Sequence, residues 1–201
     1  MATKDHQSEP IESASETLQR IFDGHGSVLG SQMADESSRY DVLKKTDFPK
    51  PQRTRRIAVA NQKGGVGKTT STVNTAAALA NKGAQVLVID MDPQGNASTA
   101  LGVSHALGEP SVYDVIEGRS DLGDVITVCP DFPTLDVVPA SIDLSGAELE
   151  VVDLPNRNTL LKEALDLYLR QSDKHYDYVF IDCPPSLGLL VINAMCAVTE
   201  M

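Results

Sequence analysis

Residues 57–70 read Ile-Ala-Val-Ala-Asn-Gln-Lys-Gly-Gly-Val-Gly-Lys-Thr-Thr, a short apolar run followed directly by a glycine-rich loop. Four consecutive apolar residues are typical of a parallel strand that is covered on both faces. The glycines let the backbone curl so that successive N–H groups point inward at an anion. A helix free of Gly and Pro is expected from Thr69 to Lys82, and its N-terminus would present further N–H groups to the same anion. The stretch therefore predicts a phosphate-binding loop between a strand and a helix.

Three side chains of this loop have predicted roles in binding a nucleotide. Lys68 supplies a positive charge to the β- and γ-phosphates, the Thr69 hydroxyl is placed to ligate Mg²⁺, and Thr70 is placed to hold the α-phosphate. The whole predicted nucleotide-binding set is Lys63, Gly64, Gly65, Val66, Gly67, Lys68, Thr69 and Thr70.

Further apolar runs predict an α/β fold with a mostly parallel sheet flanked by helices. Residues 86–89 and 178–181 are strong strand candidates, and 135–138 is a weaker one. Residues 158–171 form an amphipathic helical pattern, and a mostly apolar helix is expected at about 187–198. Strand, helix and strand in this order predict right-handed βαβ units. Because open α/β sheets usually have more strands, we expect the fold to be incomplete at the C-terminus.

Carboxylates follow two of these strands. Asp90 and Asp92 stand at the end of the 86–89 run, and Asp182 stands at the end of the 178–181 run. The carboxyl ends of parallel strands face the ligand crevice, where the phosphate loop also lies. An acidic residue there could orient a water in line with a γ-phosphate, or could hold Mg²⁺.

The motifs also depart from the general phosphate-loop pattern in one informative way. Gln62 stands where that pattern has its first glycine, and a second lysine, Lys63, opens the loop. With the segments Asp-Met-Asp-Pro-Gln-Gly-Asn at 90–96 and Asp-Cys-Pro-Pro-Ser at 182–186, this deviant Walker A motif resembles the ParA/Soj family of partition ATPases, which are P-loop NTPases. The resemblance spans about residues 55–198.

The resemblance implies an ATPase that uses ATP and Mg²⁺ and forms an ATP-dependent homodimer. It implies that Lys63 reaches the phosphates of the other subunit, that Asp92 positions the attacking water, and that Asp90 supports the magnesium shell. The catalytic set is then Lys63, Lys68 and Asp92, and the metal set is Thr69, Asp90 and Asp182. The implied partners are a ParB-like centromere-binding protein and non-specific DNA, the latter bound largely through regions that this chain lacks. The implied role is segregation of a chromosome or plasmid in the cytoplasm, at the nucleoid.

Two alternatives remain open from the sequence. One is a septum-positioning ATPase of the MinD type, which would use a C-terminal amphipathic membrane helix that is not visible here. The other is a non-catalytic fragment that binds only phosphate or a partner.

Composition and charge argue against several other classes of protein. The chain has 201 residues, three cysteines without metal-ligand spacing and scattered histidines, so neither a disulfide scaffold nor a metal site beyond nucleotide-bound Mg²⁺ is expected. The N-terminus lacks the apolar region of a secretory signal, and 187–198 is too short for a membrane span. The net charge is −11, and residues 104–153 account for most of it, with eleven acidic residues against Arg119. This stretch is typical of a solvated acidic flank.

The chain divides into two parts that differ in amino-acid composition. Residues 1–52 are Ser-rich and acidic and predict a flexible extension, whereas 53–201 carry the AAA-type P-loop nucleotide-binding domain. Within the extension, four apolar residues recur at roughly helical spacing: Ile11, Leu18, Ile21 and Phe22. They indicate either an amphipathic helix that docks on a partner or membrane, or a marginal helix in a mobile tail.

Overall fold

The computed structural model describes residues 28–46 and 48–201, and the chain divides into two units, Met1–Phe48 and Pro49–Met201. The described residues of the first unit form one helix, α2 (Val28–Lys45), whose last turn carries Lys44 and Lys45. The sequence does not predict α2, because the apolar residues of this helix do not gather on one side. The apolar spacing noted between Ile11 and Phe22 lies outside the described residues.

The second unit is built on a sheet whose strands have the order β1-β5-β2-β4-β3. These are β1 (Arg55–Val59), β2 (Val86–Asp90), β3 (Thr127–Val128), β4 (Leu135–Val138) and β5 (Tyr178–Asp182). All neighbours pair in parallel except β3, which is antiparallel to β4. The four strands expected from apolar runs are therefore confirmed. The short β3 was missed because both of its residues are exposed and carry no apolar pattern.

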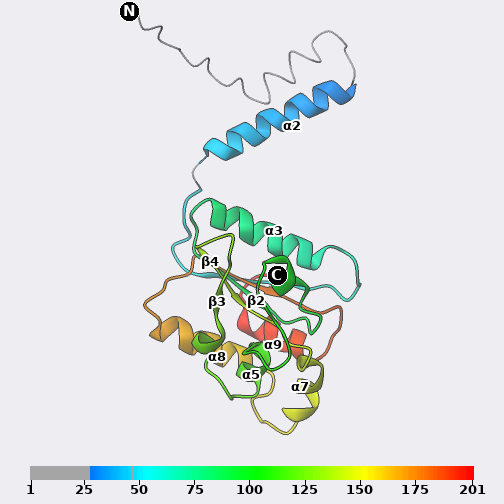
Figure 1. The fold of residues 1–201 in the computed structure, drawn as a ribbon, viewed down its shortest axis with the longest axis vertical. Coiled ribbons are helices and arrows are strands. Elements are labelled where there is room, and N and C mark those ends of the chain that lie inside the picture. Colours follow the sequence, from blue (N-terminus) through cyan, green and yellow to red (C-terminus); the bar gives the residue numbers. More distant parts are fainter. Residues whose placement is uncertain (1–27, 47) are drawn as a thin grey trace, which may run out of the picture. The chain divides into compact units, whose positions relative to one another are not determined.

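Helices cover both faces of this sheet (Figure 1). One face carries α3 (Lys68–Asn81), with α4 (Asn96–Ala100) packed beside it. The opposite layer consists of α5 (Val112–Ile116), α6 (Leu122–Val125), α7 (Leu144–Glu150), α8 (Leu160–Gln171) and α9 (Leu189–Ala197). The helices expected at 69–82, 158–171 and 187–198 are thus confirmed to within a few residues. No described helix is long and apolar enough to cross a membrane.

The central strand β2 shows why a continuous apolar run becomes a strand here. All five of its residues are buried, and their side chains alternate between two hydrophobic clusters. Val86 and Val88 pack with the α3 side, whereas Leu87 and Ile89 pack with the α8 and α9 side. Full burial of each such side chain contributes about 1.5–3 kcal/mol.

The parallel pairing brings the carboxyl ends of the strands to one edge. Asp90 of β2 is in register with Asp182 of β5, and Val59 at the end of β1 is in register with the same Asp182. The glycine-rich loop leaves β1 at this edge and leads directly into α3. The edge therefore holds the predicted loop and both strand-end carboxylates, as the sequence implied.

Candidate functional site

The glycine-rich loop turns tightly before α3. Gly65 and Gly67 have φ angles of 71° and 87°, in the left-handed region that side-chain-bearing residues rarely adopt. Gly67 caps α3, and its carbonyl accepts a 2.8 Å hydrogen bond from the Ser71 N–H. The first N–H groups of α3 consequently remain directed out of the helix end, where they can bind an anion.

A cavity of about 520 Å³ opens at this helix end. It is lined by residues from all three sequence motifs: Gly64, Gly65, Gly67, Lys68, Thr69, Thr70, Asp92, Gln94, Asn96 and Pro185. The structure thus brings together most of the predicted nucleotide-binding residues with Asp92. Lys63, Val66, Asp90 and Asp182 do not line the cavity.

The two lysines of the loop lie in different surroundings. Lys68 Nζ is 3.4 Å from the Lys63 carbonyl oxygen, and within the described part of the chain its ammonium forms no salt bridge, although it attracts the Asp182 carboxylate from farther away. Its charge is therefore available to an anion in the cavity. Lys63 is exposed, and its backbone N–H donates to Oδ1 of Asn61 at 3.0 Å, which fixes the start of the loop.

Asp182 connects β5 to α3. Its Oδ2 accepts a 2.7 Å hydrogen bond from the Thr69 hydroxyl, and its Oδ1 accepts a 3.1 Å hydrogen bond from the Thr72 hydroxyl. Burial raises the pKa of this carboxyl above its ordinary value, although both hydroxyls counteract the rise. Thr72 was not singled out in the sequence; its position four residues after Lys68, one turn along α3, is the signal that could have identified it.

Asp90 is enclosed behind the cavity wall. Its Oδ2 accepts hydrogen bonds of 2.8 Å from both the backbone N–H and the hydroxyl of Ser98, and its Oδ1 accepts one of 3.1 Å from the Asp92 N–H. Burial raises the pKa of Asp90 to about 6 despite these contacts. Asp90 therefore holds in place both the turn after β2, through Asp92, and helix α4, through Ser98. Nothing in the sequence indicated Ser98 as its partner, because the two residues are joined only through the fold.

Asp92 faces the cavity from the turn after β2. Its Oδ1 accepts a 3.1 Å hydrogen bond from the Gln94 N–H, and its carbonyl accepts a 2.9 Å hydrogen bond from the Gly95 N–H. Within the described residues its second carboxylate oxygen accepts no hydrogen bond, and the side chain remains slightly open, at 8% exposure for the residue. This oxygen is free to contact a molecule in the cavity.

The cysteines take no part in the site. All three are free, and burial raises the pKa of Cys183 to about 12, so its thiol stays protonated and unreactive at neutral pH. The described residues contain no cluster of three or more His, Cys, Asp and Glu side chains that could hold a metal ion by themselves.

Comparison with known proteins supports this arrangement. A family model described as an AAA domain matches residues 54–201. The chain is 50% identical over 141 residues to the sporulation initiation inhibitor protein Soj of Bacillus subtilis, covering 70% of this chain and 54% of Soj. It is 48% identical over 141 residues to the chromosome partitioning protein ParA of Caulobacter vibrioides, covering 70% of this chain and 52% of ParA. The chain spans about half the length of these curated relatives.

Solved structures of differently named proteins share the fold of this chain. A cobyrinic acid a,c-diamide synthase from Mycobacterium smegmatis is 40% identical with a TM-score of 0.66, covering 72% of this chain and 55% of that one. A plasmid partition protein from Borrelia burgdorferi is 27% identical with a TM-score of 0.64, covering 73% of this chain and 62% of that one. With its glycine-rich loop, its strand-end carboxylates and the match over residues 54–201, the chain belongs to the AAA domain family and, within it, to the P-loop proteins of the ParA/Soj type.

Proposed function

We propose that this chain is the nucleotide-binding part of a partition protein that binds and hydrolyses ATP with Mg²⁺. The observation that carries the proposal is the cavity in which Lys68 and the N-terminus of α3 lie beside the Thr69–Asp182 contact. The Mycobacterium smegmatis structures are described with a bound ATP analogue and magnesium or with ADP and magnesium, and a putative Borrelia burgdorferi plasmid partition protein is described with AMPPNP.

The loop binds the phosphates by charge and by backbone dipoles. Lys68 forms no salt bridge among the described residues, so it breaks none when it contacts a β- or γ-phosphate. Gly64, Gly65 and Gly67 bring backbone to the cavity without side chains, which leaves room for a triphosphate. Thr70 lies at the first turn of α3 and is placed to contact the α-phosphate.

The side chains at this edge fit a magnesium ion. Mg²⁺ prefers oxygen ligands and keeps several waters, so it needs few protein ligands beside the phosphates. The Thr69 hydroxyl is the proposed direct ligand, and Asp182 holds that hydroxyl at 2.7 Å and binds the ion directly or through water. Asp90 supports this arrangement from behind, because both of its oxygens are already engaged. The bound ion would neutralise phosphate charge during transfer.

Asp92 and Lys63 have the proposed roles in hydrolysis. Asp92 offers an unoccupied carboxylate oxygen to the cavity, which can orient a water in line with the γ-phosphate. The Lys63 side chain is exposed outside its own cavity, which suits a residue that contacts the phosphates of a second subunit. Subunits that closed in this way would associate more tightly in one nucleotide state than in the other. This difference in dimer affinity would let the nucleotide switch the protein between monomer and dimer.

The wider role follows from the relatives named for chromosome partitioning. The ATP-bound dimer would bind non-specific DNA at the nucleoid in the cytoplasm, and a ParB-like partner would stimulate hydrolysis and release. Residues 53–201 would form the nucleotide-binding unit, and residues 1–52 would lie outside it.

Phosphate release from ATP by the purified chain tests the proposal. Lys68→Ala should abolish both ATP binding and release, whereas Asp92→Ala should retain binding and lose turnover by about a hundredfold or more. Asp121→Ala, at an exposed position in the same unit, is the matched control and should match the wild type. Equal rates in the wild type and Asp92→Ala would refute hydrolysis at this site, and binding without turnover in the wild type would leave a nucleotide-binding fragment.

A further inference from the structure

The side chain of His105 lies against the turn that presents Asp92 to the cavity. A Cβ atom at Gly95 would come within 2.6 Å of both Nδ1 and Cε1 of His105, so the ring fills the space that this glycine leaves open. Gly95 is buried and closes the turn, because its N–H donates to the Asp92 carbonyl at 2.9 Å. The ring therefore packs on the residue that completes the Asp92 turn.

A hydrogen bond to α4 fixes the orientation of this ring. The Thr99 hydroxyl and Nε2 of His105 lie 2.8 Å apart and share a hydrogen bond. Thr99 belongs to α4, and its N–H donates to the Gly95 carbonyl at 2.9 Å. The ring, the helix and the turn thus form one closed set of contacts. A ring held at Nε2 presents its Nδ1–Cε1 edge to Gly95, so the imidazole is held in one orientation against the turn.

The loop between α4 and α5, residues 101–111, keeps its shape through a carboxylate at its centre. Oε2 of Glu109 accepts a 2.6 Å hydrogen bond from the Ser104 hydroxyl and one of 3.0 Å from the Ala106 N–H. These two donors stand on either side of His105 in the sequence. They also hold the pKa of Glu109 below its ordinary value, so this carboxylate stays charged at neutral pH. The backbone on both sides of His105 is therefore fixed.

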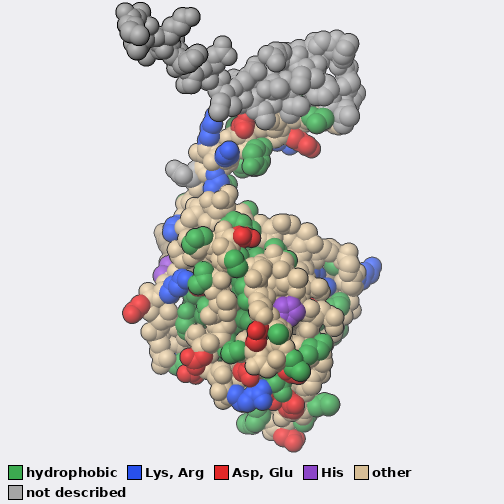
Figure 2. Space-filling view, in the orientation of Figure 1, with side chains coloured by type: hydrophobic (Ala, Val, Ile, Leu, Met, Phe, Trp, Pro, Cys, Tyr) green, Lys and Arg blue, Asp and Glu red, His purple; other side chains and the backbone are tan. Residues whose placement is uncertain are grey.

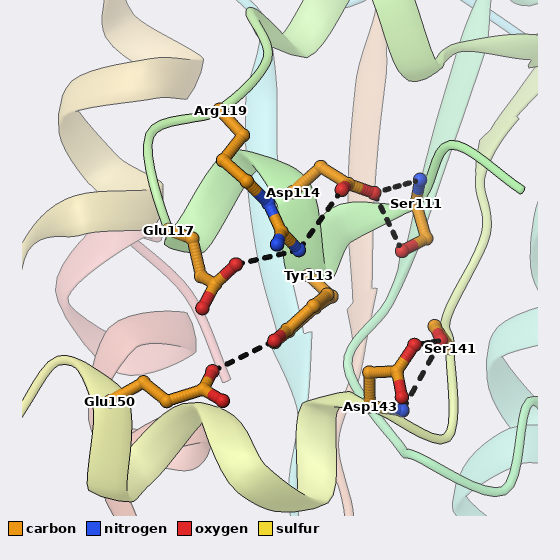
Figure 3. Close-up of polar contacts among 8 residues, drawn as sticks. All are labelled: Ser111, Tyr113, Asp114, Glu117, Arg119, Ser141, Asp143 and Glu150. Atoms are coloured by element: carbon orange, nitrogen blue, oxygen red, sulfur yellow. Dashed lines mark hydrogen bonds and ion pairs between the residues drawn. The ribbon is translucent and has the colours of Figure 1, made fainter. Parts of the chain in front are cut away.

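The end of the loop is fixed at the start of α5. The Ser111 N–H and hydroxyl donate to Oδ2 of Asp114 at 2.9 Å and 3.2 Å, and Nη2 of Arg119 lies 3.2 Å from Oδ1 of the same carboxylate (Figure 3). The next residue, Val112, is buried, and its N–H donates to the Pro139 carbonyl at 2.9 Å. The loop thus forms a fixed support behind the His105 ring.

We infer that His105 is a positioning residue for Asp92, and this inference rests on the proposed role of Asp92 in hydrolysis. A group that orients a reacting water must be held to within about 0.5 Å by the residues behind it. The His105 ring supplies this support, because it keeps the turn closed at Gly95 while the second carboxylate oxygen of Asp92 faces the cavity.

His105 acts on turnover and not on nucleotide binding. The described residues that line the cavity include none from the 101–111 loop. The phosphate contacts proposed for Lys68 and the N-terminus of α3 lie on the other side of the cavity motifs, in a separate stretch of chain. Loss of the ring should therefore slow hydrolysis and leave the affinity for ATP unchanged.

Phosphate release and nucleotide affinity of the complete 201-residue chain test the inference. His105→Ala should lower kcat about tenfold, while its affinity for a fluorescent ATP analogue stays within about twofold of the wild type. His105→Phe keeps a ring over Gly95 and should recover most of the lost turnover. Thr99→Val removes the hydroxyl that orients the ring and should give an intermediate loss. Leu107→Ala, 76% exposed in the same loop, is the matched control and should turn over like the wild type.

These exchanges at position 105 do not open the core. His105 is half-buried, and Figure 2 shows histidine side chains at the surface of the second unit. The melting temperature of His105→Ala should therefore stay close to that of the wild type, so a lower kcat cannot be attributed to unfolded protein.

Amide hydrogen exchange separates this inference from the proposed function. If the wild-type chain releases no phosphate, the proposed hydrolysis fails, and the Gln94 and Gly95 N–H groups, which both donate to Asp92, still report whether the ring holds the turn. Both should exchange about tenfold faster in His105→Ala and recover in His105→Phe. The Ser71 N–H, which donates to the Gly67 carbonyl in the phosphate loop, is the internal control and should exchange at the same rate in all variants.

Several results would overturn the inference. One is an unchanged kcat in His105→Ala in a chain that hydrolyses ATP, and another is unchanged exchange at both amides of the turn. A fall in kcat matched by an equal fall in nucleotide affinity would show a general structural role instead. If His105→Phe recovered neither turnover nor amide protection, the ring contact with Gly95 would not be the cause, and the inference would fail.

Discussion

The Thr69 hydroxyl donates a 2.7 Å hydrogen bond to Oδ2 of Asp182, and this contact joins the first turn of α3 to the end of β5. Asp182 is buried, so its charge depends on such donors; Thr72 supplies the second one at 3.1 Å. The two elements are far apart in sequence but meet at the edge where the phosphate loop lies. The Thr69–Asp182 contact therefore both stabilises this edge of the sheet and positions the two side chains proposed to hold Mg²⁺.

Removing the Thr69 hydroxyl should separate these two contributions. Thr69→Ala leaves Asp182 with one donor and should cost about 1–3 kcal/mol in the free energy of unfolding. It should also weaken Mg²⁺-dependent binding of a fluorescent ATP analogue about tenfold or more, while affinity in the presence of EDTA changes little. Thr69→Ser retains the hydroxyl and is the control. Equal loss of Mg²⁺-dependent affinity in both variants would show that the hydroxyl is not the ligand.

The turn beside Asp92 should be sensitive to any side chain at Gly95. Gly95 has a φ angle of 63°, and a Cβ atom there would come within 2.6 Å of the His105 ring. Gly95→Ala should therefore cost about 2–3 kcal/mol, combining left-handed strain with the clash. Gly118→Ala is a matched control, because its φ is 71° and nothing lies within 4 Å of its Cβ position, so only the strain remains.

A double variant identifies the role of the ring. His105→Ala removes the ring that the new methyl group would meet. The double variant should therefore lose less free energy of unfolding than the sum of the losses in the two single variants. Urea unfolding measures all four proteins. Strict additivity would mean that the turn shifts to accommodate the methyl group without pressing on the ring.

The sequence predicted the sheet and the loop because their signals are local. Residues 86–89 of β2 are all apolar because the strand is covered on both faces. The glycines of the loop predict a tight turn because Gly65 and Gly67 adopt positive φ angles that other residues rarely adopt. The short helices α4 to α7 and the antiparallel β3 are too brief to show a period. The contact of Asp90 with Ser98 could not be predicted, because it depends on how α4 folds back on β2.

Stability should depend on pH through the ion pair between β1 and α8. Asp166 accepts hydrogen bonds from Arg56 Nη1 at 2.5 Å and from Lys162 Nζ at 2.7 Å. Burial opposes ionisation of this carboxyl, but the contacts with Lys162 and Arg56 outweigh burial and hold its pKa below the ordinary value. The stabilisation is therefore present above the unfolded-state pKa, about 4, and is lost as the pH falls through the lower folded-state pKa.

Asp166→Asn should reveal this dependence directly. The variant should be about 1 kcal/mol less stable than the wild type at pH 7, and the difference should shrink toward zero as the pH falls below about 4. Denaturant unfolding at a series of pH values measures it, with Asp121→Asn at an exposed position as the control. A difference that stays constant down to acidic pH would mean that the ion pair does not stabilise the fold.

The buried amide of Asn193 should be among the most costly side chains to replace outside the site. Asn193 interrupts the apolar surface of α9, yet it is fully buried because three backbone groups use its amide. Its Nδ2 donates to the carbonyls of Arg157 and Leu189 at 2.7 Å and 3.1 Å, and its Oδ1 accepts from the Leu161 N–H at 3.2 Å. The side chain thus ties α9 to the start of α8.

Asn193→Leu tests whether hydrogen bonding or burial decides this position. Leucine would suit the apolar surroundings but would leave the Leu161 N–H and the Arg157 carbonyl without their side-chain partner. Since each unsatisfied buried group costs about 1–3 kcal/mol, the variant should lose about 2–4 kcal/mol in urea unfolding. Asn74→Leu, at an exposed position of α3, should change stability by less than about 0.5 kcal/mol. If Asn193→Leu were as stable as the wild type, the added apolar burial would outweigh the lost hydrogen bonds, and the junction of α8 and α9 would be held by packing alone.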